Sequence, residues 1–177
     1  MKYTIDNIPA DSEFIFFWGH QPTKDGSISK TCFSQWWLSS FTVDEVEYKS
    51  AEHWMMAQKA KLFGDTSVLT QILACSSPAE AKNLGRAVKN YDDHLWLNHR
   101  YQIVKDGNFH KFNQNMALKQ FLLDTHNKTI VEASPVDPIW GIGLAKDHKD
   151  CSNPAMWKGL NLLGFALMEV RDELKLV

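Results

Sequence analysis

Ser50-Ala51-Glu52-His53-Trp54-Met55-Met56-Ala57-Gln58-Lys59-Ala60 (residues 50–60) is the strongest helix signal in this chain. Ser50 is a good N-cap, and good helix formers follow it without an intervening Gly or Pro until Gly64. The stretch therefore predicts a helix from about Ala51 to Phe63.

One face of this predicted helix mixes charge with apolar side chains. At 100° per residue, Glu52, Met55, Met56, Lys59 and Phe63 fall on one stripe. The acid and the amine are about 10 Å apart along the axis, too far for a surface pair of the i,i+4 kind. They suit opposite ends of a bound molecule. The alternative is that Glu52 only favours the helix N-terminus and that Lys59 keeps its ammonium in water.

The composition predicts one ordinary globular domain. The chain has 177 residues, of which 44% are hydrophobic and 23% charged, unlike a disordered or coiled-coil protein. The formal net charge of −2 gives no electrostatic reason for the chain to coat nucleic acid. We predict a single domain over residues 1–177, with its core from about residue 14 to 175.

The cysteines and the first residues predict a reduced, cytoplasmic protein. Cys32, Cys75 and Cys151 are odd in number and lack CxxC spacing, which predicts neither a disulfide framework nor a zinc site. Residues 1–9 contain no apolar leader segment, and no run approaches the ~20 apolar residues of a membrane span. We therefore predict no bound metal and no membrane partner.

Hydrophobic periodicity predicts a mainly α protein with small β elements. Strands are expected at residues 14–18 and 129–133, and a hairpin at 41–43 and 46–48. Further helices are expected over 65–74, from Ser77 to a stop at Gly85, over 91–109 and 113–123 with a break at Gly107-Asn108, and over 159–175. Residues 134–143 are dense in Pro and Gly and predict a rigid irregular loop.

Asp137 is a candidate functional acid in this loop. It lies between Pro135 and Pro138, three residues before Trp140-Gly141. A carboxylate held rigidly beside an indole suits hydrogen bonding to a polyol or bracing of a catalytic group. Capping of a turn is the alternative, and the spacing alone favours it. Together with Glu52, Asp137 could perform acid–base chemistry on a glycosidic bond, but spacing does not show that the two meet.

Other candidates carry cationic or aromatic groups. Lys59 suits a phosphate contact or a desolvated nucleophile, and a lysine lying along the surface is the alternative. Trp96 suits stacking on a base, and a core tryptophan is the alternative. Lys82 and Gly85-Arg86 could supply anion contacts, but the chain has no GxGxxG, GxxxxGK[ST], GxSxG or HExxH pattern. The familiar Rossmann, P-loop, serine hydrolase and zinc peptidase routes are therefore not supported.

Seven blocks of the chain together resemble the NADAR family, also called YbiA-like. They are FFWG (16–19), CFSQWW (32–37), SAEHWMMAQKA (50–60), KNLGR (82–86), KFNQN (111–115), SPVDPIWGIG (134–143) and NLLGFALMEVR (161–171). The blocks follow the family's order and cover most of the chain from Phe16 to Leu174. The resemblance implies a compact, mainly α domain with small β elements (α+β). It also implies an N-glycosidase that cleaves ribosyl C–N bonds without a metal or redox cofactor.

Two substrate classes follow from the resemblance. One comprises phosphorylated ribosylamino-pyrimidine intermediates of riboflavin biosynthesis, and the other is ADP-ribose attached to guanine. The expected partner is thus a small nucleotide or ADP-ribosyl molecule, or a modified guanine within nucleic acid, and the role is metabolite repair or reversal of a nucleic-acid modification. The oligomeric state is not indicated. A non-catalytic ADP-ribose or nucleotide sensor is the alternative function, and a structural protein with only core tryptophans is a weaker one.

The resemblance also places functional residues. By position, it assigns Glu52, Trp96, and the acid and indole of the D-x-x-WG block, Asp137 and Trp140. Residues 33–36 depart from the family pattern, because simpler members have F-S-N-F where this chain has F-S-Q-W. The longer Gln35 and the extra Trp36 bear on which base or phosphate is accepted.

Residue chemistry and resemblance combine into one mechanistic hypothesis. Cleavage of a glycosidic C–N bond passes through a ribosyl cation and needs an acid–base group and planar groups that hold the base. Glu52 is the predicted acid–base residue, Asp137 orients ribose or water, and Lys59 grips phosphate or forms a Schiff base at the anomeric carbon. The predicted substrate-binding residues are Trp18, Gly19, Gln35, Trp36, Arg86, Trp96, Trp140 and Gly141.

Overall fold

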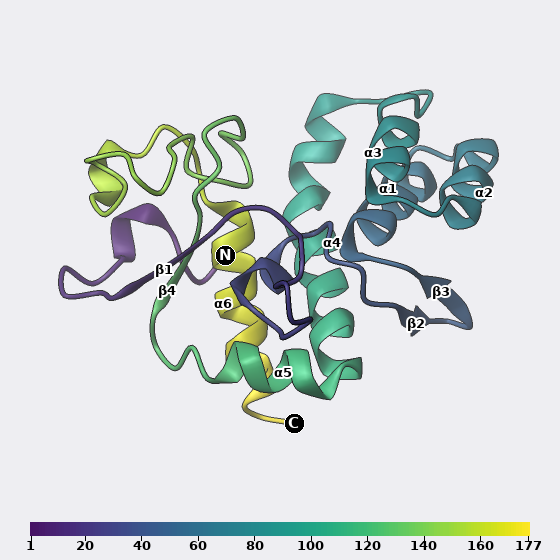
Figure 1. Cartoon of the computed structure of the whole chain (residues 1–177). Helices are drawn as coiled ribbons and strands as arrows, with labels where there is room; N and C mark the ends of the chain where they lie inside the picture. The colour runs from purple at the N-terminus through teal and green to yellow at the C-terminus, as the bar shows by residue number, and fades with distance from the viewer. The chain divides into compact units, whose positions relative to one another are not determined.

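The structure, a computed structural model, describes residues 1–177 and divides into two compact units (Figure 1). Unit 1 is built from residues 1–34 and 116–177, and unit 2 is the continuous segment 35–115. Each unit has its own helices and its own two-stranded sheet. The single domain over 1–177 stays a prediction.

Unit 2 is organised around one buried helix. Its elements are β2 (Phe41–Val43), β3 (Val46–Tyr48), α1 (Ala51–Leu62), α2 (Thr66–Ala74), α3 (Pro78–Arg86) and α4 (Asp93–Gln114). Helix α1 packs against α2, α3 and α4, and every residue from Ala51 to Ala57 is buried. A helix enclosed in this way has no solvent face for its first two turns, so its polar residues there are buried as well.

The helix starts predicted from N-cap residues are confirmed. Ser50 Oγ accepts the amide of His53, and Ser77 Oγ accepts the amide of Glu80. Asp65 caps α2 in the same way through Val68. Each cap satisfies one of the amides that a helix N-terminus leaves without an intrahelical partner.

The predicted hairpin is confirmed with its residue bounds. Strands β2 and β3 pair antiparallel, Phe41 opposite Tyr48 and Val43 opposite Val46. Asp44 and Glu45, the two residues between the strands, have positive φ values of 50° and 64°. Positive φ at both positions is typical of the two-residue hairpin turns whose twist matches that of the flanking strands.

Two glycines that were expected to interrupt helices lie inside them instead. Helix α3 continues through Gly85, where a Cβ atom would lie 1.9 Å from the sulfur of Met56. Helix α4 continues through Gly107, where a Cβ atom would lie 2.3 Å from the Trp54 indole. The helix ends at Gln114 instead, with Asn115 as its C-cap. Both glycines therefore permit close packing on α1.

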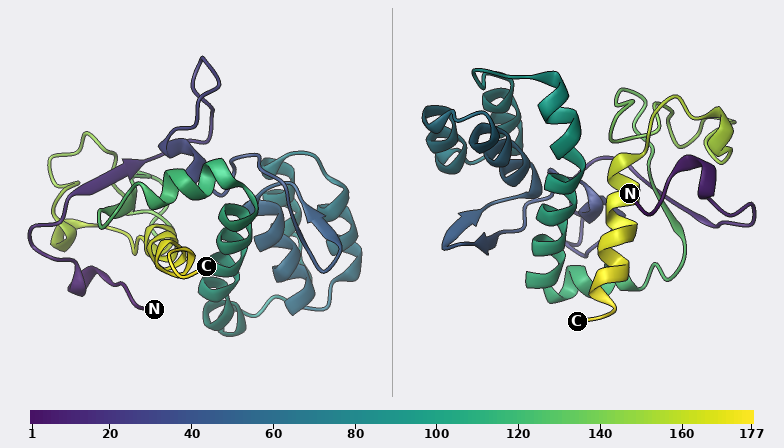
Figure 2. Two further views of the ribbon diagram at one scale, coloured as in Figure 1. Left: turned by 90° about the horizontal axis from the view of Figure 1, so that it is seen from below. Right: turned by 180° about the vertical axis from the view of Figure 1, so that it is seen from behind.

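Unit 1 combines a parallel strand pair with two helices. Its elements are β1 (Phe14–Phe17), α5 (Met116–Leu123), β4 (Thr129–Glu132), α6 (Leu162–Leu174), and the 3₁₀ turns η1 (Ile5–Asn7), η2 (Lys30–Phe33) and η3 (Pro154–Met156) (Figure 2). Strands β1 and β4 pair in parallel, Phe14 opposite Thr129. Both strands were predicted, and α6 packs against β4.

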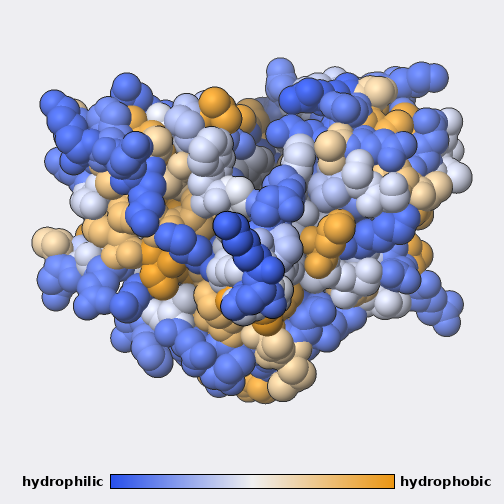
Figure 3. All heavy atoms as spheres, viewed as in Figure 1, coloured by the Kyte–Doolittle hydropathy of each residue, from blue (hydrophilic) through white to orange (hydrophobic).

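Apolar side chains enclose this strand pair. Val131, Ala133, Ile142, Leu144 and Cys151 form a buried cluster, against which Phe14, Phe16 and Trp157 pack. Figure 3 shows hydrophobic residues gathered over β1 and β4 among hydrophilic ones. The apolar positions predicted for the last helix, Leu163, Ala166, Leu167, Val170 and Leu174, are all buried.

Helix α6 begins later than predicted because of Asn161. This residue adopts a left-handed conformation with φ 52°, and its side chain bridges to β4. Its Nδ2 donates to the Ile130 carbonyl at 3.0 Å, and its Oδ1 accepts the Glu132 amide at 3.0 Å.

No helix of the structure is long and apolar enough to cross a membrane.

Candidate active site

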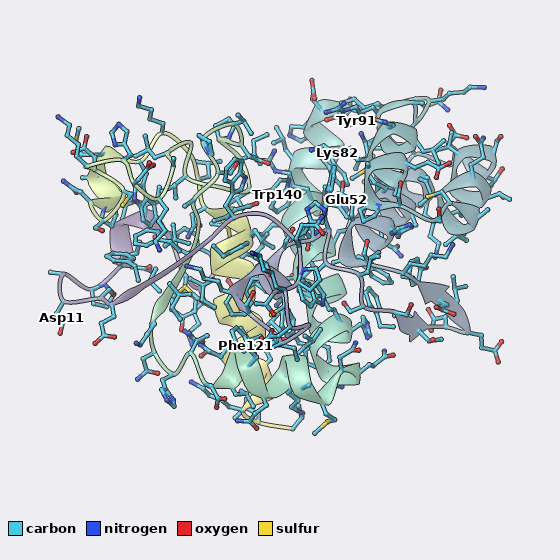
Figure 4. The ribbon with its side chains drawn as sticks, in the orientation of Figure 1. Asp11, Glu52, Lys82, Tyr91, Phe121 and Trp140 are labelled. Atoms are coloured by element: carbon cyan, nitrogen blue, oxygen red, sulfur yellow. The ribbon has the colours of Figure 1, made fainter.

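Glu52 occupies the first turn of α1 and is only 4% exposed. Its backbone amide donates to the Gln35 carbonyl at 3.0 Å, so the segment before the hairpin is joined to the start of the helix. Figure 4 labels Glu52 on unit 2, together with Lys82 and Tyr91. A carboxylate so placed is held near the positive end of the α1 dipole and largely shielded from water.

Gln35 holds this arrangement through its side-chain amide. Its Oε1 accepts Nδ2 of Asn108 at 2.7 Å, and its Nε2 donates to the Met55 sulfur at 3.7 Å. Asn108 Nδ2 also donates to the Val104 carbonyl of α4 at 2.9 Å. The buried amide of Gln35 therefore ties α1 to α4, which sequence reasoning had not anticipated.

Two cationic residues of α3, Lys82 and Arg86, lie in the same unit as Glu52. The Lys82 ammonium lies 5.6 Å from the centre of the half-buried Trp36 ring. Arg86, the last residue of α3, is exposed. Because the Glu52 amide is bonded to the carbonyl of Gln35, the backbone that leads into Trp36 starts at the first turn of α1.

The Lys59 ammonium does not point freely into water. It donates to the Gly85 carbonyl at 2.8 Å and lies 4.4 Å from the centre of the Tyr91 ring and 5.6 Å from that of Trp96. Burial lowers the pKa of Lys59, while the charge of Asp93 acts in the opposite direction. The Lys59 side chain is therefore half-buried, and its role stays a prediction.

The unit 1 candidates lie around the loop 134–143. Asp137 Oδ1 accepts the amides of Ile139 and Trp140, each at 2.8 Å, so the carboxylate caps a turn. Gly141 is buried, and a Cβ atom there would lie 2.8 Å from the Glu132 carbonyl oxygen. Its own carbonyl accepts the Asn161 amide at 3.0 Å. This loop is thus fixed by its own hydrogen bonds and by close packing on β4.

The remaining candidates of this unit differ in exposure. Trp140 is half-buried, whereas Trp18 is 58% exposed. Gly19 has φ +82°, a conformation that L side chains rarely adopt, with open space around the position of a Cβ atom. No group of three or more His, Cys, Asp or Glu side chains could hold a metal ion.

Taken by unit, the predicted residues form two sets. Gln35, Trp36, Glu52, Lys59, Arg86 and Trp96 belong to unit 2, and Trp18, Gly19, Asp137, Trp140 and Gly141 belong to unit 1. Tyr91 is a neighbour of Lys59 that sequence reasoning missed. It lies in the turn before α4, where no periodicity or motif marked it.

The sequence profile of the NADAR domain matches residues 16–175. The chain belongs to the NADAR family. This NADAR chain is 43% identical over 166 residues to a protein of Acanthamoeba polyphaga mimivirus named N-glycosidase R617, covering 91% of this chain and 96% of that protein.

Two bacterial proteins are also similar to the NADAR chain. The NMR structure of Escherichia coli YbiA matches with a TM-score of 0.74 and 27% identity, covering 93% of this chain and 86% of that chain. That protein is named N-glycosidase YbiA. A riboflavin biosynthesis protein of Vibrio vulnificus is 32% identical over 136 residues, which are 77% of this chain and 33% of that protein.

These comparisons confirm the predicted family and fold class, a mainly α, YbiA-like domain with small strands. They also confirm the prediction of an enzyme of the hydrolase class that acts on N-glycosyl bonds. The individual site residues stay predictions.

Proposed function

We propose that this NADAR protein hydrolyses the C–N bond between ribose and a nitrogen base in a phosphorylated, nucleotide-type substrate. The observation that carries the proposal is the placement of α1. Its first turn presents the buried Glu52 beside the Trp36 segment, and two turns later the same helix presents Lys59 among aromatic rings.

The chemistry assigned to Glu52 is proton transfer. As the C1′–N bond breaks, its electron pair leaves with the base, and positive charge develops on the ribose. Water then adds its oxygen to C1′. Glu52 moves one proton from that water to the departing nitrogen, and its negative charge stabilises the ribosyl cation. For Asp137, which belongs to unit 1, the orienting of ribose or water stays a separate prediction from the family resemblance.

Lys59 has two alternative roles. As a phosphate contact, its ammonium pairs with the substrate phosphate. As a nucleophile, the neutral amine attacks C1′ and displaces the base, which takes up a proton that the amine loses. The bond from C1′ to the ring oxygen then breaks to give a Schiff base, and water hydrolyses that C=N bond. The pKa of Lys59, lowered by burial from its ordinary 10.5, makes the neutral amine more accessible than in a surface lysine.

pH separates these two roles. A nucleophilic Lys59 predicts that the rate of base release rises with pH up to the pKa of Lys59. A phosphate contact predicts instead that KM rises as the ammonium loses its proton. Borohydride trapping adds a direct test, because only the Schiff base gives a stable covalent adduct on Lys59.

A phosphorylated ribosylamino-pyrimidine is the first substrate candidate. The similarity to a protein of riboflavin biosynthesis supports this choice, as do the cations Lys82 and Arg86 in the unit that carries Glu52. ADP-ribose attached to guanine is the second candidate, because the indole of Trp36 with Lys82 above it would also suit a larger base.

The test offers both substrates in parallel and measures free base by chromatography. Wild-type protein is expected to release base from one of them, and Glu52→Gln to do so about 10²–10⁴-fold more slowly, as for loss of a general acid–base group. Glu47→Gln, at an exposed position of β3, is the matched control and should keep full activity.

Two results would contradict the proposal. An unchanged rate in Glu52→Gln would remove Glu52 from the mechanism. Tight binding of ADP-ribose with no base released from either substrate would instead favour a nucleotide sensor.

A further inference from the structure

Three groups from different parts of unit 2 surround the Lys59 ammonium. The Gly85 carbonyl, in the last turn of α3, accepts one of its N–H bonds at 2.8 Å. The rings of Tyr91 and Trp96 lie 4.4 Å and 5.6 Å from the nitrogen. An ammonium has three donors and no acceptor, and here a carbonyl and two ring faces contact it, while the negative charge of Asp93 also favours its charged form.

Tyr91 itself is fixed by local structure. Asn90 before it adopts a left-handed conformation with φ 56°, and Asp92 after it caps α4 by accepting the Leu95 amide at 2.7 Å. The Tyr91 ring packs on Phe63, the C-cap of α1, with ring centres 5.3 Å apart. Although 44% of Tyr91 is exposed, its ring therefore has one defined place against Lys59.

We propose that Tyr91 is a positioning residue for Lys59, acting through the face of its ring. The proposal rests on the role of Lys59 in the function proposed above and adds a residue to it. Whether Lys59 grips phosphate or attacks C1′, its nitrogen must stay within a narrow range of positions, and a misplacement of about 1 Å can cost about 10²-fold in rate. The Gly85 carbonyl holds the nitrogen from one direction, and the Tyr91 ring, which is nearer than that of Trp96, restricts its movement from another.

Two variants separate the ring from the hydroxyl. Tyr91→Phe keeps the ring but removes the hydroxyl, whose pKa is raised by burial and by a hydrogen bond to Asp93. Tyr91→Leu removes the ring and keeps an apolar side chain. We expect Tyr91→Phe to release base within about 3-fold of wild type and Tyr91→Leu to be about 10- to 100-fold slower. Thermal melting checks that both variants fold.

A second measurement reports the placement of Lys59 without any substrate. Lysines are methylated with ¹³C-formaldehyde and a borohydride, and the Lys59 signal is identified by its loss in Lys59→Gln. Lys61→Gln, a change of the exposed lysine on the same helix, serves as the control. We expect the Lys59 methyl signal to show a ring-current shift in wild type and Tyr91→Phe, and to move toward the signals of exposed lysines in Tyr91→Leu.

The outcomes separate this proposal from the proposed function. Loss of the ring-current shift in Tyr91→Leu with wild-type turnover would overturn the positioning role, as would a defect in Tyr91→Phe equal to that in Tyr91→Leu. A wild-type protein that shows the shift but cleaves neither substrate would overturn the proposed function and leave the placement of Lys59 by Tyr91 standing.

Discussion

His53 is a buried histidine on the same helix as Glu52 and Lys59. It is 1% exposed, and its Nδ1 is paired with Ser50 Oγ at 2.8 Å. Burial lowers the pKa of His53 from its ordinary value of 6.5. A hydrogen bond to the Cys75 backbone and the charge of Glu80 act against this, and the charge of Lys49 acts with it. The neutral imidazole is therefore the form that the folded protein favours.

This burial predicts a loss of stability in mild acid. Because the unfolded chain binds the His53 proton at a higher pH than the folded chain does, the free energy of unfolding falls as pH drops from about 6.5 toward the folded pKa. Denaturant unfolding at several pH values between 7.5 and 5 measures this fall in the free energy of unfolding. His53→Gln is expected to show a flatter profile, whereas His99→Gln, on the exposed face of α4, should keep the slope of wild type. Equal slopes in all three proteins would contradict the prediction.

Single residues also show where sequence reasoning about the site ended. The burial of Glu52 followed from its place on an apolar stripe. The partners of Lys59 did not, because Gly85 and Tyr91 lie far along the chain and meet it only after α3 and α4 pack on α1. For Asp137 the turn-capping alternative is seen, and its proposed role with ribose or water is additional to that cap.

At the scale of elements, Gly107 sets how closely α4 approaches α1. The Trp54 indole lies directly over it and donates its Nε1–H to the Ile103 carbonyl of the same helix at 2.8 Å. A Gly-to-Ala change in an unobstructed helix would gain up to about 1 kcal/mol of helix propensity. Here the added methyl would lie within 2.3 Å of the indole.

We therefore expect Gly107→Ala to destabilise the protein. Overpacking typically costs about 1–3 kcal/mol against a propensity gain of up to about 1 kcal/mol, which gives a net loss of up to about 2 kcal/mol. Urea unfolding measures the loss as a lower midpoint with an unchanged slope. Asn98→Ala, at an exposed position of α4, is the control and should stay within about 0.5 kcal/mol of wild type. A stabilised Gly107→Ala would show that the indole moves aside easily.

The helices and strands themselves were largely predictable, and their interruptions were not. Caps such as Ser50 and Ser77 act locally, so sequence alone located them. Gly85 and Gly107 resemble helix breakers in sequence, but their function is to let a neighbouring side chain come close, which depends on tertiary packing. Asn161 was missed for the same reason, since its hydrogen bonds reach a strand about 30 residues earlier in the chain.

At the scale of the whole molecule, chain connectivity couples the two units. Unit 1 consists of two separate segments, joined through the continuous segment of unit 2. Folded unit 2 holds its own ends together, because Gln114 exchanges two hydrogen bonds with the backbone of Thr42, and Asn115 Nδ2 donates to the Ser40 carbonyl. The link between the two halves of unit 1 is therefore short only while unit 2 is folded.

This coupling predicts one unfolding transition for the whole chain. If unit 2 unfolded first, unit 1 would have to close a loop on the order of 80 residues instead of a few, a loss of about 2.5 kcal/mol in its stability. Calorimetry should then show a single peak of roughly 120 kcal/mol near 60 °C, with equal calorimetric and van't Hoff enthalpies. Gly107→Ala, although it lies in unit 2, should shift the entire peak to lower temperature. Two peaks, of which only one responds to Gly107→Ala, would mean that the units unfold independently and that the predicted single domain is wrong.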